Sequence, residues 1–500
     1  MRVLWLCNIM LPIIADNLGR EASNKEGWLS GICAQAVANG RECGLELGIA
    51  FPVHPGDALL GNPQAQTNVY SFTMDVPAHT TDVPARAAQT DSTECYRIRC
   101  YAFGEEVLKA HIYPDTIEES MRRIVDDFAP DLVHCFGTEY PHTLAMCRIF
   151  PDKNRVIVGM QGVCTMIDRA YLADLPPAVQ KRVTLRDFLK KDSIMQQKEK
   201  FAIRAKSERL SLSLAGNAVG RTQFDRSYVE AIHPGIRYFR LNESLRDCFY
   251  EDCWSPDACE AHSIFVSQAD YPLKGLHYLL IAAGALLGDY PDLQIRVAGD
   301  SLVEHQTLKQ KLKTSSYGKY LRDLIREQGL DGRVHFLGRL TAEQMKAQYL
   351  QCGLFVCCSS NENSPNSLGE AMLLGVPCVA ARVGGIPDLL EDGVDGILFD
   401  GCKAGVKCNN TCYDITDVIG EDLNLPADET DKQPQIQEKS ELFEISQNLE
   451  KAIRTMWQEP GQRIAFGNAA RNHAQKTHER GTNFTKMTEI YASVMAGTKL

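Results

Sequence analysis

Two glutamates, Glu362 and Glu370, are the residues whose types and spacing most directly suggest chemistry in this 500-residue chain. They lie in the stretch SSNENSPNSLGEAM, residues 359–372, on either side of a Pro-Asn-Ser turn. Glu362 follows an apolar run, and Glu370 falls where a helix is expected to begin. Because exposed amides at a helix start attract anions, phosphates above all, this stretch predicts a ligand site beside both carboxylates.

The elements that flank the two glutamates place them at one edge of a sheet. The preceding run CGLFVCCSS is short, continuous and rich in Phe, Val and Cys, which is typical of a strand buried on both faces of a parallel sheet. The following run SLGEAMLLG predicts a helix with Ser367 as its N-cap and with Gly375 and Pro377 at its end. In open α/β sheets, ligands bind in the crevice beyond the carboxyl ends of the strands.

A purely structural interpretation of the same residues remains open. Ser367 and Glu370 match the capping box S-x-x-E, in which both side chains bond to the backbone at the helix start and no ligand is needed. Glu362 can equally be a solvated loop carboxylate. The rest of the chain has to decide between the two interpretations.

The composition is that of an ordinary globular protein with two cores. Of the 500 residues, 44% are hydrophobic and 23% are charged, and the length exceeds what one core usually organises. The net charge of -11 argues against nucleic acid as a partner, because a nucleic-acid-binding surface is basic. Many of the 18 cysteines lie inside apolar runs, as buried thiols do in a reducing compartment, so we expect a cytoplasmic protein.

Three features that could indicate other classes of protein do not. Cys402, Cys408 and Cys412 lack the paired C-x2-C spacing of structural zinc sites, so we predict no metal there. The opening MRVLWLCNIMLPII has one basic residue and no small-residue cleavage pattern, which favours a first buried strand over a signal peptide. No apolar run approaches the roughly 20 residues that span a bilayer.

Strand-like and helix-like segments alternate along the chain, which predicts an α/β protein with parallel sheets. The first domain is predicted over residues 1–250, with a turn-rich excursion at 54–94. The second is predicted over 255–475, with a polar inserted loop at 401–440, and a C-terminal helix at 476–500 could pack back on the first domain. We therefore expect two doubly wound parallel-sheet domains that face each other across a cleft.

Several motifs, in order along the chain, carry a resemblance to a known family. The segment NENSPNSLGEAMLLGVPCVAARVGGIPDLLEDGVDGILF resembles the E-x7-E region of the family 4 retaining glycosyltransferases of bacterial polysaccharide type. FVSQADYPLKGLHYLL resembles the phosphate-binding lysine segment of that family, RVHFLGRLTAEQMKAQY its nucleobase segment, and GNAVGRTQFD the end of its first domain. The resemblance implies the GT-B fold.

The resemblance also implies roles for individual residues. Glu370 would bind the ribose hydroxyls of a nucleotide sugar and Glu362 the hydroxyls of the donor sugar, since a carboxylate accepts two hydroxyl protons at a fixed spacing. Lys274 would neutralise the diphosphate and stabilise the charge that grows as the nucleotide leaves. Backbone contacts to the donor are implied for Gly27, for Leu340 at the base, and for the amides of Asn366, Ser367 and Leu368.

The chain departs from the family pattern at three places. Ala269 stands where the family usually has an arginine, Glu26-Gly27 replaces a glycine pair, and Gln161 replaces a histidine. Gln161 can hydrogen-bond a sugar, but it cannot carry a proton as imidazole can. Two further residues, His134 and Arg221, could face the cleft or serve a structural role.

The resemblance implies retaining transfer of a sugar from a nucleotide-sugar donor to an acceptor hydroxyl. No D-x-D triplet occurs in the chain, so we expect transfer without a metal and with no cofactor beyond the donor substrate. The alternatives are a nucleotide-sugar epimerase of GT-B fold and a nucleotide-sugar-binding protein with little catalysis. The donor is left open, and the resemblance favours a glycan or lipid-linked acceptor in surface or capsular polysaccharide or glycolipid assembly.

Residues 181–209 contain ten Lys or Arg against four Asp or Glu in a chain of opposite net charge. If helical, this segment would offer a basic face to anionic lipid headgroups, which predicts peripheral contact with the inner face of the membrane. The alternative is an ordinary helical surface whose apolar residues face the core. Those residues are Val183, Leu185, Phe188, Leu189, Ile194 and Phe201.

Overall fold

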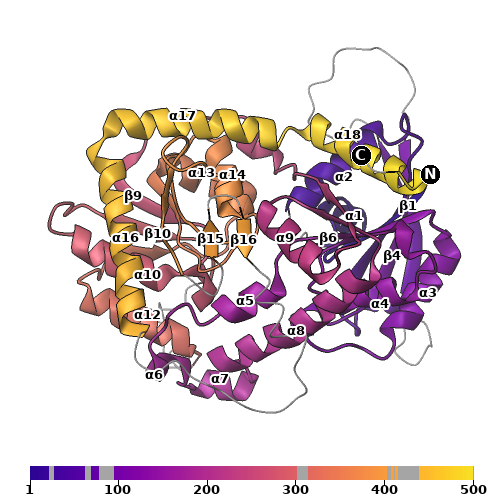
Figure 1. Ribbon diagram of the computed structural model, residues 1–500, viewed down its shortest axis with the longest axis horizontal. Helices are drawn as coiled ribbons and strands as arrows, with labels where there is room; N and C mark the ends of the chain where they lie inside the picture. The colour runs from indigo at the N-terminus through magenta and orange to yellow at the C-terminus, as the bar shows by residue number, and fades with distance from the viewer. Residues whose placement is uncertain are drawn as a thin grey trace.

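The computed structural model describes residues 1–21, 27–61, 69–77, 95–300, 313–402, 407–409, 412–414 and 438–498. These residues form two α/β domains, each built on its own sheet, and Figure 1 shows them side by side. The predicted insertion at 401–440 lies largely outside the described residues, which include from it the strand pair β15 (Lys407–Asn409) and β16 (Cys412–Asp414).

The first domain has an eight-stranded sheet in the order β3-β4-β2-β1-β5-β6-β7-β8. All neighbouring strands are parallel except β3 and β4. The strands are β1 (Arg2–Leu6), β2 (Glu46–Val53), β3 (Val69–Pro77), β4 (Cys95–Gly104), β5 (Leu132–Phe136), β6 (Val156–Gly159), β7 (Asn217–Gly220) and β8 (Arg237–Arg240). The helices are α1 (Pro12–Asn17), α2 (Gly27–Asn39), α3 (Ile117–Phe128), α4 (Pro141–Ile149), α5 (Cys164–Ala170), α6 (Pro177–Gln180), α7 (Leu185–Lys190), α8 (Ile194–Leu214) and α9 (Gln223–Ile232).

Strand β3 lies within the predicted excursion at 54–94 and adds an antiparallel edge to the sheet. Its side chains alternate between exposed and buried only near its end, so its sequence lacks the continuous apolar run of the central strands. By contrast, every residue of β5 is buried. Residues 62–68 and 78–94 of the excursion lie outside the described part of the chain.

The second domain has a six-stranded, entirely parallel sheet in the order β11-β10-β9-β12-β13-β14. Its strands are β9 (Glu260–Val266), β10 (Gln294–Val297), β11 (Val334–Phe336), β12 (Cys352–Cys357), β13 (Cys378–Ala381) and β14 (Ile397–Phe399). The helices include α10 (Leu276–Leu286), α12 (Ser316–Glu327), α13 (Ala342–Gln351), α14 (Asn366–Leu373), α16 (Glu438–Gln458) and α17 (Pro460–Thr477). All six residues of β12 are buried, as the apolar run CGLFVC predicts.

Two segments connect the domains in addition to the linker between their sheets. Helix α18 (Arg480–Ala496) follows α17 and packs on the first domain, where Phe484, Met487 and Tyr491 join the core of that domain. Figure 1 shows α17 and α18 passing along the top of the molecule and the two chain ends lying together. The Tyr491 hydroxyl accepts a hydrogen bond from the Trp5 indole at 2.9 Å.

The second connecting segment runs from α5 to the start of α8, along the lower part of the view in Figure 1. It belongs to the first domain in sequence, yet Tyr171, Leu175 and Val179 join the core of the second domain. The imidazole of His277 on α10 contacts the carbonyl of Ala173 at 2.8 Å. The sequence pattern did not predict this exchange, because apolar spacing shows that a face is buried but not which domain buries it.

Candidate functional site

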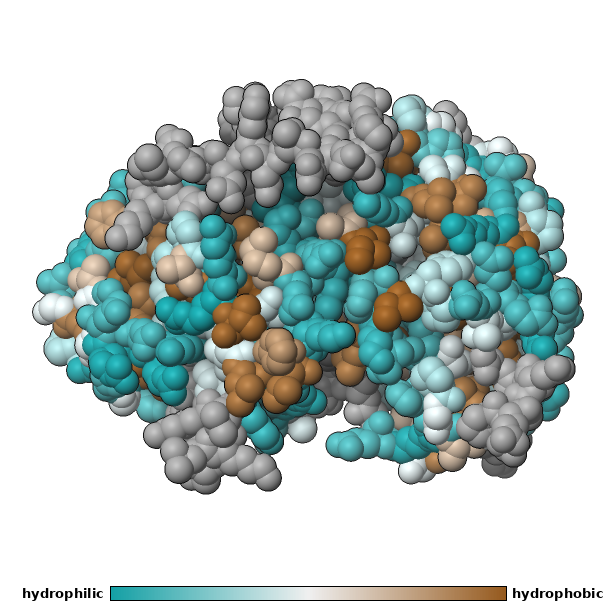
Figure 2. Space-filling model, turned by 90° about the horizontal axis from the view of Figure 1, so that it is seen from below, coloured by the Kyte–Doolittle hydropathy of each residue, from teal (hydrophilic) through white to brown (hydrophobic). Residues whose placement is uncertain are grey.

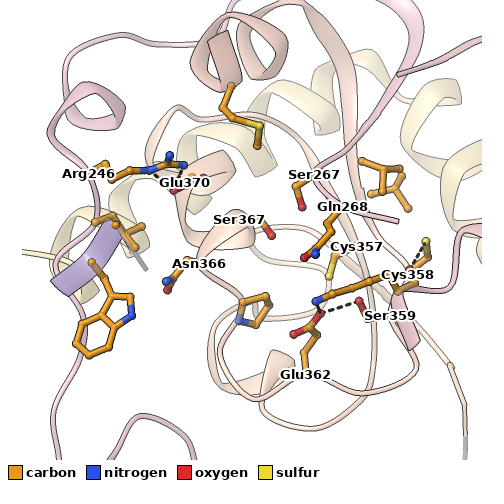
Figure 3. Close-up of a pocket in the computed structure, with 18 residues that line it drawn as sticks. Arg246, Ser267, Gln268, Cys357, Cys358, Ser359, Glu362, Asn366, Ser367 and Glu370 are labelled. Atoms are coloured by element: carbon orange, nitrogen blue, oxygen red, sulfur yellow. Dashed lines mark hydrogen bonds and ion pairs between the residues drawn. The ribbon is translucent and has the colours of Figure 1, made fainter. Parts of the chain in front are cut away.

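A cavity of about 320 Å³ lies between the two domains and holds both glutamates of the 359–372 stretch. The first domain and the linker contribute Gly27, Trp28, Leu245 and Arg246. The second domain contributes residues beyond the carboxyl ends of β9 and β12 and from the start of α14, among them Ser267, Gln268, Lys274, Glu362, Asn366, Ser367 and Glu370. This is the crevice where open α/β sheets bind ligands. Figure 3 shows Glu362 and Glu370 on opposite sides of the cavity, with Asn366 and Ser367 between them.

Glu362 forms an ion pair with Lys274 at one end of the cavity. Its Oε1 accepts hydrogen bonds from Lys274 Nζ at 2.6 Å and from Ser359 Oγ at 2.8 Å. Burial by itself would lower the pKa of Lys274, but the adjacent Glu362 carboxylate outweighs burial, so the pKa is raised. Lys274 is therefore a cation at neutral pH, and Glu362 holds it in place beyond the carboxyl ends of the strands.

Two glycines allow the backbone to place this pair. Gly275 follows Lys274 at φ +70°, and a Cβ there would lie 1.8 Å from the carbonyl oxygen of Cys358. Gly384 has φ +51°, and a Cβ there would lie 1.8 Å from the carbonyl oxygen of Glu362. Only glycine fits both the left-handed conformation and the close approach, so the two loops that carry Lys274 and Glu362 are locked together.

Glu370 forms a second ion pair, with Arg246 of the linker, at the other end of the cavity (Figure 3). Its Oε1 accepts from Arg246 Nη2 at 2.6 Å and from Nε at 3.1 Å, and its Oε2 accepts from the Tyr349 hydroxyl at 3.4 Å. Burial raises the pKa of Glu370, and the guanidinium opposes that rise. The Arg246 guanidinium also lies 4.8 Å from the centre of the Phe249 ring.

The capping-box interpretation of Ser367 and Glu370 is wrong. Helix α14 begins at Asn366, and the N-cap position is Pro365, which makes no side-chain capping bond. Ser367 is already inside the first turn, and the Glu370 carboxylate turns toward Arg246 instead of the helix start. Glu370 therefore lines the cavity, where Arg246 is its ion-pair partner.

Two of the predicted donor-binding residues do not line this cavity. Leu368 is fully buried, and its amide donates to the carbonyl of Pro365 at 3.0 Å. Leu340 lies before α13 and packs against the core of the second domain. Glu362, Lys274, Gly27, Asn366, Ser367 and Glu370 do line it.

His134, Gln161 and Arg221 line a second, smaller cavity in the first domain. His134 is buried, and its Nδ1 lies 2.7 Å from the Tyr491 hydroxyl of α18. Burial lowers the pKa of His134 to about 3, so the imidazole is neutral. Arg221 forms a buried ion pair with Glu243 and donates to the carbonyl of Met160 at 3.0 Å. His134 and Arg221 thus make contacts within the protein that give them a structural role. The backbone carbonyl of Gln161 accepts a hydrogen bond from the Asn363 side-chain amide at 3.2 Å.

The structure adds residues to the site that sequence reasoning missed. Arg246 is 124 residues from Glu370 and lies in the linker ESLRDCFYEDC, where periodicity lapses, so no local pattern indicates it. Gly27 packs against the same side chain, since a Cβ there would lie 2.4 Å from Arg246 Cδ. Tyr349 ends the nucleobase-like segment and could have been considered, because it lies within a quoted motif.

The described residues contain no group of three or more His, Cys, Asp and Glu side chains arranged to hold a metal ion. Of the three clustered cysteines, Cys402 has a described, partly exposed side chain, and the side chains of Cys408 and Cys412 lie outside the described part of the chain. Among the helices that the structure describes, none is both long enough and apolar enough to cross a bilayer.

Comparison with known proteins agrees with this architecture. Residues 260–405 match the family model of glycosyl transferases group 1. The D-inositol 3-phosphate glycosyltransferase of Corynebacterium urealyticum is 33% identical over 129 residues, which are 26% of this chain and 29% of that protein. The match thus spans less than a third of the length of that relative.

Solved structures match nearly the whole chain at low identity. Sucrose-phosphate synthase from Thermosynechococcus elongatus has a TM-score of 0.61 and 13% identity, with all of both chains covered. Anabaena HepE in complex with UDP-glucose has a TM-score of 0.54 and 15% identity, with 99% of this chain and all of the other covered. The predicted GT-B fold is confirmed, and the second domain of this chain carries the glycosyltransferase group 1 region.

Proposed function

We propose that this protein is a retaining, metal-independent glycosyltransferase that moves a sugar from a nucleotide-sugar donor to an acceptor hydroxyl. One observation carries the proposal: the inter-domain cavity holds Glu370 at one end and Glu362 with Lys274 at the other, and Asn366 and Ser367 at the start of α14 lie between them. In a nucleotide sugar the diphosphate likewise lies between the hydroxyls of the ribose and those of the sugar. The group 1 match over the second domain supports this class of enzyme.

Donor binding would separate the Lys274–Glu362 pair and keep the Arg246–Glu370 pair. The diphosphate would draw Lys274 away from Glu362, which frees that carboxylate to accept hydrogen bonds from the donor sugar. At the other end, Glu370 would accept from the ribose hydroxyls while it stays bonded to Arg246. As the nucleotide leaves, negative charge grows on its phosphate oxygens, and Lys274 with the first amides of α14 would stabilise that charge without reorganising.

Turnover with and without an acceptor separates the three candidate functions. A transferase needs the acceptor, a GT-B epimerase converts the donor alone, and a nucleotide-sugar-binding protein converts nothing. The donor would first be identified by a binding screen against UDP-, GDP-, ADP- and dTDP-sugars. The anomeric configuration of the product, read by NMR, tests retention.

Two further measurements test the roles within the site. Glu362→Gln should lower turnover far more than donor affinity, and equal loss of both would contradict a role at the sugar. Adding EDTA should leave turnover unchanged, and lost activity that Mg²⁺ or Mn²⁺ restores would contradict transfer without a metal.

For the acceptor, we propose a glycan or a lipid-linked glycan in surface or capsular polysaccharide or glycolipid assembly. We also propose a cytoplasmic protein that makes peripheral contact with the inner face of the membrane, and no partnership with nucleic acid. The net charge of -11 and the basic segment at 181–209 support this combination.

A further inference from the structure

Helix α7 buries a charged side chain and exposes its apolar side chains, which is the reverse of an ordinary surface helix. Its one buried residue is Asp187, which is 1% exposed, whereas Leu185, Phe188 and Leu189 are 54%, 73% and 71% exposed. Surface helices of globular proteins normally direct the apolar stripe to the core and the charges to water. Here the apolar side chains are exposed, so burial among the residues that the structure describes does not explain them.

Asp187 explains why α7 keeps this orientation. Its carboxylate accepts from the amide of Ser316 on α12 at 2.9 Å and from Arg186 Nη1 at 3.0 Å, and it closes a capping box with Thr184. The bond to Ser316 crosses from the first domain to the second and holds the polar side of α7 against the protein. Because the polar side of α7 is fixed against the protein, its apolar side faces outward.

The exposed apolar side chains form a patch that we call the docking face: Leu108, Val183, Leu185, Phe188 and Leu189. Leu108 is 84% exposed and lines one cavity together with Arg186 and Lys190, which places it beside α7. Figure 2 looks onto this side of the molecule, where hydrophobic side chains stand among hydrophilic ones. Of the six apolar residues expected to face the core, only Ile194 is buried, and Phe201 is partly buried.

Unpaired lysines border the docking face. Lys181, Lys190 and Lys191 are exposed and make no ion pair with any described residue. Three other cations of the same segment are paired: Arg186 with Asp187 and Asp192, Lys200 with Asp192, and Lys198 with Asp168. Positive charge that is not paired with a described residue therefore lies beside the apolar patch.

Exposed leucine and phenylalanine flanked by lysine is the combination that suits an anionic lipid surface. The apolar side chains enter the boundary between headgroups and acyl chains, while lysines keep their ammonium groups at the anionic headgroups. An acidic protein partner would be held by the lysines but would need its own apolar groove. A second copy of this chain would present the same basic rim, which disfavours face-to-face pairing.

The docking face also lies at an opening between the domains. Leu108 and Lys190 line one wall of a cavity of about 580 Å³, and Tyr271 and Pro272 of the second domain line another. Lys274, two residues further along, lines the donor cavity. A surface bound at the docking face would therefore lie beside a cavity whose second-domain residue Pro272 is two positions along the chain from Lys274.

We propose that Leu108, Leu185, Phe188 and Leu189 insert into the interface of an anionic phospholipid bilayer, with Lys181, Lys190 and Lys191 at its headgroups. This inference rests on the membrane contact proposed above but not on the transferase activity. It adds to the electrostatic attraction between the basic segment and anionic lipid, because it requires that specific apolar side chains become buried in the bilayer interface.

The test is flotation of the full chain with vesicles of phosphatidylcholine alone or mixed with phosphatidylglycerol, at low and high salt. The wild-type chain should float with the mixed vesicles and not with phosphatidylcholine alone. Phe188→Ser/Leu189→Ser should lower the partition at least tenfold at both salt concentrations. Lys190→Gln/Lys191→Gln should lower it about tenfold or more at low salt only, because each cation near an anionic surface contributes roughly 1 kcal/mol and salt screens it.

The matched control is Ile464→Ser on α17, which is 38% exposed and lies on the opposite side of the molecule (Figure 1). This control should float like the wild-type chain. Failure of the wild-type chain to float would overturn the membrane contact itself. Flotation of the Phe188/Leu189 variant at the wild-type level would overturn the inference of apolar insertion. Membrane binding would then rest on electrostatic attraction alone. A concentration-dependent dimer that the same variant abolishes would assign the face to self-association. None of these outcomes depends on transferase turnover.

Discussion

The pair of Arg246 and Glu370 offers the sharpest test of how the two domains build one site. The Glu370 side chain is 6% exposed and that of Arg246 is 21% exposed, so the pair is mostly shielded from water. Removing one partner of a buried pair costs roughly 3–5 kcal/mol, chiefly because the other charge is left uncompensated. Since water still reaches part of Arg246, we expect the lower end of that range.

The perturbation is a double-mutant cycle of Arg246→Met, Glu370→Gln and both together. Methionine keeps an apolar stem against Phe249, and glutamine keeps the shape of the carboxylate and its contact with Tyr349. Arg246→Met should lower the free energy of unfolding by about 3 kcal/mol, because it leaves Glu370 as an isolated buried charge. The double variant should cost less than the sum of the single variants by at least about 1 kcal/mol.

The sign of the pH dependence follows from the raised pKa of Glu370. A buried carboxyl whose pKa is higher in the folded than in the unfolded state favours folding when protonated, so its contribution falls as pH rises through that window. Without Arg246 the pKa of Glu370 should rise further. The penalty of Arg246→Met should therefore be larger at pH 8 than at pH 5, and Glu370→Gln should remove that difference.

Urea unfolding at both pH values, followed by circular dichroism and tryptophan fluorescence, measures the cycle and shows which domain unfolds. Additive costs, or a penalty of Arg246→Met that is the same at pH 5 and pH 8, would refute the reasoning. Under the proposed function, Glu370→Gln should also weaken binding of the nucleoside diphosphate in calorimetric titration. Stability lost with nucleotide affinity unchanged would leave Glu370 as a structural residue only.

Three further predictions follow from individual side chains. Lys274→Ala should weaken binding of a nucleoside diphosphate far more than of the bare nucleoside, and equal weakening in calorimetric titration would contradict a role at phosphate. Burial raises the pKa of Glu208 to about 7, so the stability of the wild-type chain relative to Glu208→Gln should fall by up to about 3 kcal/mol as pH rises from 4.5 to 7. The exposed Glu199→Gln on the same helix is the control, and a pH profile common to both variants would refute the assignment. Tyr491→Phe leaves two buried ring nitrogens without their partner and should cost roughly 1–3 kcal/mol for each, measured by urea unfolding. No loss of stability would mean that α18 is not held by these bonds.

Local pattern was enough to predict the elements and the fold class. Apolar runs such as that of β12 depend only on neighbours along the chain, and so does the turn that separates Glu362 from Glu370. The role of Lys274 came from the family resemblance and not from this pattern, and the structure places its Nζ 2.6 Å from Glu362 Oε1. The edge strand β3 was missed, since one exposed face leaves little apolar signal.

Tertiary structure decided which groups meet across long stretches of chain. Arg246 reaches Glu370 over 124 residues, and His134 reaches Tyr491 over 357 residues, so neither partner has a signature in its own segment. The same holds for α7, whose sequence is equally compatible with apolar side chains facing inward. Its orientation follows from the bond between Asp187 and the Ser316 amide of the other domain. Periodicity along a chain records that a face is buried or charged, whereas the identity of its partner depends on packing, which only the folded domains determine.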